Sequence, residues 1–427
     1  MLAADSIPGQ LTDACDEVRL ADPTDAVAGV QPRFVAAPAS TAQASAVLTA
    51  AAELGLAVIP RGSGSRLDWG APPERADLIV ETARLTRVIE HEAGDLVASV
   101  ETGVTLGQLA SVLAGAGQRL ALDLPGDGSG TIGGALATGV AGPLRLRYGS
   151  PRDLLIGITI VRADGTIARS GGKVVKNVAG YDLGKLFAGS RGTLGLITEA
   201  TFRLHPLPQS TAYVSAECDS PQTCERLLAA AMAPQLAPVA AELSWPQASA
   251  PIALGIALEG DPAGVTQRAT QLSELLAQEA GAVVSVSDSP PPWWRSGPAA
   301  QPDGTVLQLA FWPGELLTVL TELRSAAERA ALDPAVAGSA AAGVLHAAVP
   351  ATSDAKPGQI AGLVTSLRDQ LSTAPARSSV LIQHAPAAVT ELADPFGPVP
   401  ALRLMRAIKQ QFDPARMMSP GRFAGGL

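Results

Sequence analysis

The sequence predicts an α+β protein built from two domains and a short C-terminal segment. Its 427 residues exceed one average domain, and a hydrophobic content of 47% suffices to bury two cores. Up to residue 206, short strand patterns alternate with helices that end at glycine. From residue 211 the order becomes strand, helix, strand, strand, helix, which favours an antiparallel sheet with helices on one face. We therefore expect domains over 1–206 and 207–400, with 401–427 as a terminal segment.

Capping and turn signals define the elements of the first domain. Ser40 or Thr41 can cap a helix that Gly55 ends. Asp164-Gly165 is a strong turn signal, and it predicts a hairpin between the flanking apolar stretches. The expected strands are residue 35 with its neighbours, 57–59, 77–81, 87–91, 96–101, 156–163, 166–169 and 194–204, and a further helix is expected over 105–116.

The second domain repeats a strand-then-helix theme without a visible sequence repeat. Its expected strands are 213–217, 240–245, 252–258, 305–312, 343–349 and 379–383, and its expected helices are 224–232, 265–279, 316–331 and 359–371. Trp293 and Trp294 follow a run of prolines, and we expect them to pack against this domain rather than to anchor a partner. The tail should begin as a helix over 405–412 and end extended.

The stretch 124–142 is the most informative part of the chain. It reads Leu-Pro-Gly-Asp-Gly-Ser-Gly-Thr-Ile-Gly-Gly-Ala-Leu-Ala-Thr-Gly-Val-Ala-Gly. Only glycine lets backbone approach a bulky anion closely and adopt a positive φ without a steric penalty. A short helix should begin near Thr131, and its N-terminal N–H groups would face that anion. Because the stretch has no Lys or Arg, it would hold a dinucleotide diphosphate by main-chain dipoles alone; a flexible surface turn is the alternative.

A second glycine loop supports the same interpretation. The apolar strand at 57–60 runs directly into the loop 61–65, Arg-Gly-Ser-Gly-Ser, where Arg61 would supply one cation and the glycines backbone access. The spacing is not the Gly-x-Gly-x-x-Gly pattern, because Leu67 stands at the third glycine position. Asp68 comes too early to contact a ribose. The sequence therefore argues against a nicotinamide-type Rossmann site.

A third segment, residues 173–199, contains Lys-Asn-Val-Ala-Gly-Tyr-Asp-Leu and Gly-Ser-Arg-Gly-Thr-Leu-Gly-Leu-Ile-Thr. With both glycine loops and the Tyr-Gly-Ser-Pro-Arg-Asp sequence at 148–153, it resembles the vanillyl-alcohol-oxidase-like, PCMH-type FAD-binding oxidoreductases. The resemblance runs from about residue 35 to 206 and resumes in the tail. Within this family the chain is most similar to the FAD-binding E subunit of glycolate oxidase. The resemblance implies a two-subdomain FAD-binding domain, an antiparallel α+β cap, and a tail that returns to the FAD domain.

The resemblance also implies which residues contact FAD. The residues expected around the diphosphate are Arg61, Gly62, Ser63, Gly64 and Ser65. Those expected at the diphosphate and ribityl chain are Thr131, Ile132, Gly133 and Gly134. Those expected at the flavin end are Thr138, Gly139 and Gly142, and those at the adenosine half are Gly192, Gly195 and Ile197. Pro125, Gly126 and Tyr148 complete the set. Ser65 replaces the histidine that carries covalent flavin in some relatives, so the FAD should be non-covalent.

The second domain offers few candidates for catalytic or metal-binding residues. Oxidation of a 2-hydroxy acid needs a base for the hydroxyl proton and a cation for the carboxylate. Related D-lactate and D-2-hydroxyglutarate enzymes carry a metal-binding His-x-His-Gly-Asp-Gly-Asn segment, whereas this chain has only Gly-Val-Leu-His-Ala-Ala-Val-Pro around His346. One histidine is not a metal site, so no metal is expected. Structural roles are expected for His91, His205 and His384, and His346 ranks first as catalytic base.

Composition excludes several other classes. A net charge of -9 argues against a nucleic-acid partner. Cys15, Cys218 and Cys224 are too few for an iron–sulfur cluster, and we expect free thiols in a reducing compartment. The start of the chain lacks the pattern of a secretory leader, and no apolar run reaches the roughly 20 residues of a bilayer span. We expect a cytoplasmic protein, with peripheral contact to the inner face of a membrane through partners left open.

Three functional hypotheses follow. The first is an FAD-binding subunit of a glycolate (2-hydroxy acid) oxidase complex, which oxidises glycolate to glyoxylate beside a second flavoprotein subunit and an iron–sulfur subunit. The second is a self-sufficient FAD-dependent D-2-hydroxy-acid dehydrogenase or oxidase, in which Arg145, Arg147, Tyr148 or Lys173 would bind the substrate carboxylate. The third is a flavin-free scaffold, which would be colourless.

Overall fold

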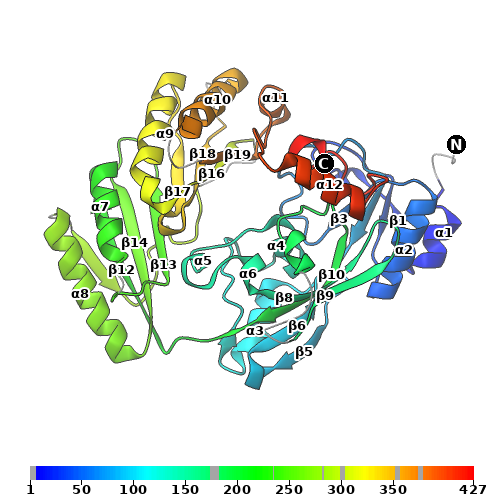
Figure 1. The fold of residues 1–427 in the computed structure, drawn as a ribbon, viewed down its shortest axis with the longest axis horizontal. Coiled ribbons are helices and arrows are strands. Elements are labelled where there is room, and N and C mark those ends of the chain that lie inside the picture. Colours follow the sequence, from blue (N-terminus) through cyan, green and yellow to red (C-terminus); the bar gives the residue numbers. More distant parts are fainter. Residues whose placement is uncertain are drawn as a thin grey trace.

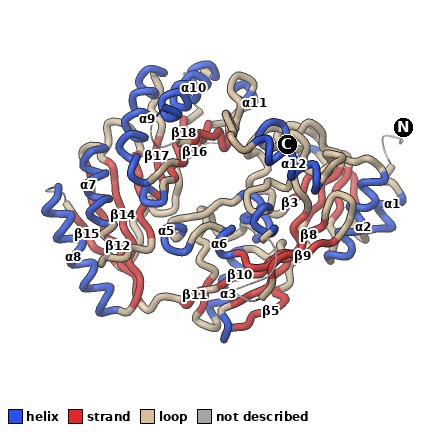
Figure 2. Tube along the Cα trace, in the orientation of Figure 1, coloured by secondary structure: helices blue, strands red, loops and turns tan. Residues whose placement is uncertain are grey.

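The computed structural model describes residues 6–173, 182–233, 235–280, 283–298, 303–351, 356–373 and 378–427. Two units of sheet and helix lie side by side (Figures 1 and 2). The N-terminal unit contains the elements from α1 to β11, and the C-terminal sheet unit contains those from β12 to β19. The mixed architecture confirms the α+β prediction. The expected domain boundaries at residues 206 and 400 stay predictions.

A four-stranded sheet forms the first layer of the N-terminal unit. Its strands, in spatial order, are β1 (Val18–Leu20), β2 (Phe34–Ala36), β4 (Leu78–Glu81) and β3 (Val58–Arg61). β2, β4 and β3 run parallel, and β1 pairs antiparallel with β2. Helices α1 (Gly9–Ala14) and α2 (Thr41–Glu53) bury Leu11 and Leu48 in the core of this layer. Ser40 caps α2 as predicted, whereas α1 and β1 were not predicted.

A five-stranded antiparallel sheet forms the second layer. Its strands are, in spatial order, β5 (Val88–Glu92), β6 (Val97–Glu101), β10 (Leu196–Arg203), β8 (Leu155–Val161) and β9 (Ile167–Gly171). The predicted hairpin between β8 and β9 is confirmed. The accompanying elements are α3 (Leu106–Ala114), α4 (Ile132–Thr138), α5 (Arg145–Tyr148), α6 (Pro151–Leu154) and the short antiparallel pair β7 (Gln118–Arg119) and β11 (His205–Pro206).

The C-terminal unit is one eight-stranded antiparallel sheet, as predicted. Its strands are, in spatial order, β15 (Val284–Ser287), β12 (Ser210–Cys218), β14 (Ile252–Gly260), β13 (Ala240–Trp245), β17 (Ala335–Ser339), β18 (Val344–Val349), β16 (Thr305–Ala310) and β19 (Ser379–His384). Helices α7 (Pro221–Ala231), α8 (Pro262–Ala280), α9 (Leu316–Ala330) and α10 (Pro357–Thr373) cover its outer face, and α5 lies on the inner side (Figure 1).

This sheet is two copies of one motif. Each half runs β-α-β-β-α-β, from β12 to β15 and from β16 to β19, and the halves meet where β13 pairs with β17. The repeat exists in the fold although none is visible in the sequence. β15 and β17 were missed because both are short and lie beside stretches without alternating hydrophobicity. The packing of Trp293 and Trp294 against this unit is confirmed, since both indoles crowd Gly255 on β14.

The tail returns to the N-terminal unit after α11 (Ala387–Thr390) and α12 (Leu402–Phe412). The N–H of Val58 donates to Met417 O at 2.8 Å, and the N–H of Ser419 donates to Val58 O at 2.8 Å. The C-terminus therefore lies beside β3 (Figure 1). The three cysteines are buried free thiols. Within the described residues no helix combines the length and the apolar content that a bilayer span requires.

Candidate functional site

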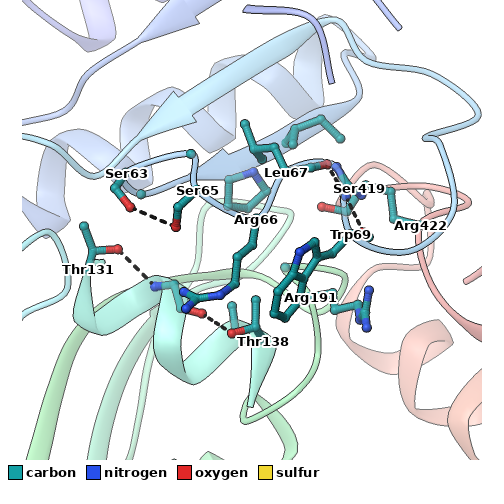
Figure 3. A pocket seen from close by; sticks show the side chains of 17 residues that line it. Ser63, Ser65, Arg66, Leu67, Trp69, Thr131, Thr138, Arg191, Ser419 and Arg422 are labelled. Atoms are coloured by element: carbon teal, nitrogen blue, oxygen red, sulfur yellow. Dashed lines mark hydrogen bonds between the residues drawn. The ribbon is translucent and has the colours of Figure 1, made fainter. Parts of the chain in front are cut away.

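Three adjoining cavities lead from the N-terminal unit to the C-terminal sheet. The central hollow encloses about 670 Å³, part of it open to solvent, between the loop after β3, helix α4, Arg191–Gly192 and the tail (Figure 3). The inner cavity, about 390 Å³, shares Pro60, Gly62 and Gly134 with it. The outer cavity, about 1030 Å³, shares Arg66 and Trp69 with it and reaches the C-terminal sheet. An elongated ligand could therefore extend from one unit to the other.

The loop after β3 is shaped as an anion cradle. The backbone N–H groups of residues 62–66 donate to no acceptor within the described residues, so five donors line this turn. Gly62 packs so closely on α4 that an added Cβ would lie 2.2 Å from Thr131 Oγ1. Consecutive main-chain donors in a turn bind phosphate well. The loop therefore fits a diphosphate, and the predicted contacts of its residues with one stay predictions.

Helix α4 differs from the expectation of an open N-terminus. Thr131 is its N-cap, and its Oγ1 accepts from the N–H of Gly134 at 3.1 Å. The N–H groups of Ile132 and Gly133 donate to Val104 O and Thr102 O. The first donors of the helix are thus already satisfied by the protein. The loop at 62–66, rather than the helix terminus, offers main-chain donors to an anion.

The cations of the central hollow also differ from the prediction. The guanidinium of Arg61 pairs with Asp25 at 2.7 Å and with Glu81, so it is neutralised away from the hollow. Arg66, Arg191 and Arg422 line the hollow instead. The expectation that the stretch 124–142 binds a diphosphate by main-chain dipoles alone stays a prediction, and these three arginines add cations that were not predicted. Sequence reasoning missed the three arginines because they come from segments far apart in the chain.

These arginines sit against aromatic rings and carbonyl groups. Arg66 lies 5.2 Å from the Trp69 ring centroid, and Arg191 lies 5.2 Å from that of Phe396. Arg422 donates to Leu67 O at 2.6 Å and to Trp69 O at 2.8 Å. Burial lowers the pKa of Arg66, and it lowers that of Arg191 to about 10. Burial and the charge of Arg191 together lower the pKa of Arg422 to about 10.

The inner cavity gathers the residues expected at the adenosine half. Gly192, Gly195 and Ile197 line it together with Gly133 and Arg61. It is the smallest of the three cavities, and its walls are mostly backbone and apolar side chains. The expectation that Ile197 contacts the cofactor through its backbone is compatible with this placement and stays a prediction.

The outer cavity carries two histidines. His346 from β18 and His384 from β19 line it with Gln383, Asp68 and Pro125. Asp68 Oδ2 lies 2.7 Å from His384 Nδ1. Burial opposes ionisation of Asp68, but the contact with His384 outweighs it and holds the pKa of this carboxyl below its usual value. A histidine oriented by a carboxylate is the usual arrangement of a general base.

His346 lies in a different electrostatic environment. Burial, with a contribution from the charge of Arg145, lowers the pKa of His346 to about 4. On β13, burial raises the pKa of Glu242 to about 8, although Ser339 Oγ donates to its carboxyl group. Burial likewise raises the pKa of Asp123 to about 7. Since an efficient base has a pKa near the working pH, His346 is a poorer candidate than the sequence ranking suggested.

Several predicted residues lie outside the three cavities. Ile132 is fully buried in the core, and Gly139, with a φ of 69°, ends α4. An added Cβ on Gly142 would lie 1.9 Å from Asp123 O, so this glycine is explained by packing. Gly126 adopts a φ of 114° in the loop before α4. Cofactor contacts for these four stay predictions.

Tyr148 contributes to the junction between the units. Its hydroxyl donates to Glu259 Oε2 at 3.0 Å and accepts from Arg119 Nη2 at 2.9 Å. Lys173 pairs with Glu90 far from this contact, and the stretch 174–181 of the third motif lies outside the described residues. Within the described residues, no three His, Cys, Asp or Glu side chains gather as a metal-binding group.

The comparisons with known proteins agree with this geometry. Residues 32–171 match the model of an FAD binding domain, and residues 383–423 match that of the C-terminal domain of FAD linked oxidases. These two matches confirm the resemblance to the FAD-binding, PCMH-type oxidoreductases that the three motifs indicated. They support an FAD-dependent oxidoreductase.

The relatives of this protein differ in how much of its length they match. An uncharacterised FAD-linked oxidoreductase of Mycobacterium tuberculosis is 29% identical over 99% of this chain and 95% of its own length. Glycolate oxidase subunit GlcD of Bacillus subtilis is 39% identical over 42% of this chain and 38% of its own length. The D-lactate dehydrogenase of Archaeoglobus fulgidus is 39% identical over 40% of this chain and 38% of its own length. The chain thus spans well under half of these two characterised relatives.

The fold also matches a solved structure. An alkyldihydroxyacetonephosphate synthase superposes with a TM-score of 0.70 at 17% identity, over 92% of this chain and 78% of the other. This match supports the architecture alone. The residues of the central hollow fit FAD, because the loop at 62–66 has open main-chain donors and three arginine side chains line the same hollow.

Proposed function

We propose that this protein converts a 2-hydroxy acid to the 2-oxo acid, with the substrate in the outer cavity. The similarity to GlcD and to D-lactate dehydrogenase supports hydroxy-acid oxidation in general. The observation that carries the proposal is the Asp68–His384 pair, which stands in the cavity next to the central hollow. FAD, when bound, accepts two electrons and one proton in the form of hydride.

The chain supplies the proton chemistry in this proposal. The carboxylate of Asp68 lies 2.7 Å from Nδ1 of His384, and in this proposal the imidazole of His384 takes the hydroxyl proton of the substrate. Loss of that proton and of a hydride from the same carbinol turns the alcohol into a carbonyl and balances the reaction. Pro125, Val140 and Val306 give the outer cavity apolar walls on which the carbon chain of a substrate could pack.

The placement of the cofactor follows from the three cavities. We propose the diphosphate at the loop 62–66, the adenosine half in the inner cavity beside Gly192, Gly195 and Ile197, and the flavin between Thr138 and the outer cavity. This placement retains most of the predicted contacts. It also puts the reactive part of the flavin next to His384, where the chemistry requires it.

A more specific proposal is that the protein is a subunit of a glycolate oxidase complex. The wording of the third motif supports this assignment, as does the similarity to a subunit named for that complex. We propose that the chain receives electrons from glycolate and passes them to an iron–sulfur partner beside a second flavoprotein subunit. Contact with a membrane would then be made through those partners.

The Asp68–His384 pair favours the second candidate function. A chain with its own oriented base has the proton-handling group that a self-sufficient D-2-hydroxy-acid dehydrogenase or oxidase requires. Purified FAD-loaded chain, assayed with glycolate or D-lactate and an artificial dye, separates the two. Full turnover without partners would support the self-sufficient enzyme, whereas reduction of the bound flavin without turnover would support the subunit.

A further inference from the structure

The central hollow carries three positive charges and no negative one. Of the described residues that line it, Arg66, Arg191 and Arg422 are the charged ones. The side chains of Arg66 and Arg191 make no hydrogen bond or ion pair to any described residue beyond their contacts with aromatic rings. Burying a cation without an anion is costly. A hollow that keeps three of them therefore points to an anionic ligand.

We propose that Arg66, Arg191 and Arg422 form a diphosphate clamp, which binds the two phosphate groups of FAD by side-chain charge. This inference rests on the proposed placement of FAD in the central hollow. It adds to that placement a set of ligands that the glycine loops did not reveal. The chemical class of the ligand is a dianionic diphosphate, which two or more guanidinium groups can bind in a bidentate manner.

The three cations approach the hollow from different sides. Arg66 follows the loop 62–65 directly and reaches toward the start of α4, where its Nη1 lies 3.7 Å from the place that an added Cβ on Gly130 would take (Figure 3). Arg191 and Arg422 lie together beside Trp69 (Figure 3). All three line the hollow that residues 62–65 also line. A diphosphate bound there would meet both main-chain donors and side-chain cations.

The available main-chain donors explain why side-chain charge is needed. The N-terminal N–H groups of α4 are satisfied by Thr102, Val104 and Thr131, so the helix adds few direct hydrogen bonds. Arg61 is neutralised by Asp25 and Glu81. The loop N–H groups alone would leave the two charges of the diphosphate uncompensated. The clamp supplies that compensation.

Arg422 links the clamp to the tail. Its guanidinium donates to Leu67 O and Trp69 O, so the tail also holds the loop that contains Arg66. An added Cβ at Gly70 would lie 2.5 Å from Arg191 Nη1, which shows how closely this loop packs on the second arginine. The binding of a diphosphate would therefore hold loop, tail and the segment before β10 together.

The test measures binding rather than turnover. Apoprotein is titrated calorimetrically with FAD, with ADP (a diphosphate without flavin) and with riboflavin (a flavin without phosphate). The variants are Arg66→Gln, Arg191→Gln, Arg422→Gln and the charge-retaining Arg191→Lys, and the matched control is the exposed Arg169→Gln on β9. Each glutamine variant should weaken FAD and ADP by about tenfold to a hundredfold, while riboflavin binding is unchanged. Arg191→Lys should recover part of the loss.

Other outcomes overturn the clamp. Unchanged FAD and ADP affinities with a raised KM for the hydroxy acid would assign the arginines to the substrate carboxylate. Weakening confined to Arg422→Gln would assign that arginine to tail docking alone, because it also bonds two carbonyl groups. A wild-type protein that binds neither FAD nor ADP would contradict the proposed function itself, which separates the two failures.

Discussion

Asp68 Oδ2 contacts His384 Nδ1 at 2.7 Å, so the loop after β3 reaches the last strand of the C-terminal sheet at the outer cavity. The same loop donates the N–H of Gly70 to Gln383 O at 3.1 Å. Two contacts thus join the loop proposed to bind the cofactor to the strand that carries the proposed base. In the proposed function, this arrangement would let a base in one unit serve a flavin bound mainly by the other.

His384→Gln is expected to slow reduction of the bound flavin by about 10²- to 10⁴-fold, because the hydroxyl proton loses its acceptor. Asp68→Asn should act in the same direction by removing the orienting carboxylate. FAD content should stay at the wild-type level in both. Stopped-flow mixing with a 2-hydroxy acid under anaerobic conditions measures the rate. The comparison variant is His346→Gln; a larger loss there than in His384→Gln would assign the base to His346.

Gly62→Ala is expected to weaken FAD binding and destabilise the protein by about 1 kcal/mol or more, since it displaces the N-cap of α4. The new Cβ would lie 2.2 Å from Thr131 Oγ1, a distance that requires movement. Gly94→Ala is a matched control, because nothing lies within 4 Å of its added Cβ. Urea unfolding and FAD titration are the measurements. Equal effects of the two substitutions would refute the close approach.

Glu242 is expected to make stability depend on pH. Its folded pKa of about 8 lies above the ordinary 4.5, so between these values the folded state binds more protons than the unfolded state. The free energy of unfolding therefore falls as pH rises through this window, by up to ~1.4 kcal/mol per unit from this group. Glu242→Gln removes this loss and should melt higher than wild type near pH 9. The exposed Glu217→Gln should follow wild type; if it matched Glu242→Gln, the assignment would fail.

Breaking the buried pair between Arg119 and Glu259 should destabilise the junction of the two units. Arg119 Nη1 lies 2.8 Å from Glu259 Oε1, and the side chains are 16% and 9% exposed. Glu259→Gln leaves a buried cation uncompensated, at a cost on the order of 3 kcal/mol in the free energy of unfolding. The double variant Arg119→Met/Glu259→Leu should lose less than Glu259→Gln alone. Additive losses in urea unfolding would show that the pair is not coupled.

The parts of the site that follow from local sequence could be predicted. The helix start at Thr131 and the glycine-rich turn after β3 both depend on residues that are close together in the sequence. Composition and spacing therefore reveal them. The cations could not be found in this way, because Arg66, Arg191 and Arg422 meet only when three segments fold together. Arg61 is the arginine that directly precedes the glycine loop in the sequence, yet its guanidinium forms an ion pair with the buried Asp25. The sequence likewise ranked His346 above His384, and only the fold shows that Asp68 lies beside His384.

Anaerobic mixing of the purified, FAD-loaded chain with a panel of 2-hydroxy acids tests the central claim most directly. The account predicts that at least one acid bleaches the oxidised flavin absorbance and yields the matching 2-oxo acid, and that His384→Gln suppresses this bleaching. An oxidised flavin that persists with every acid, in protein that retains its FAD, would contradict it.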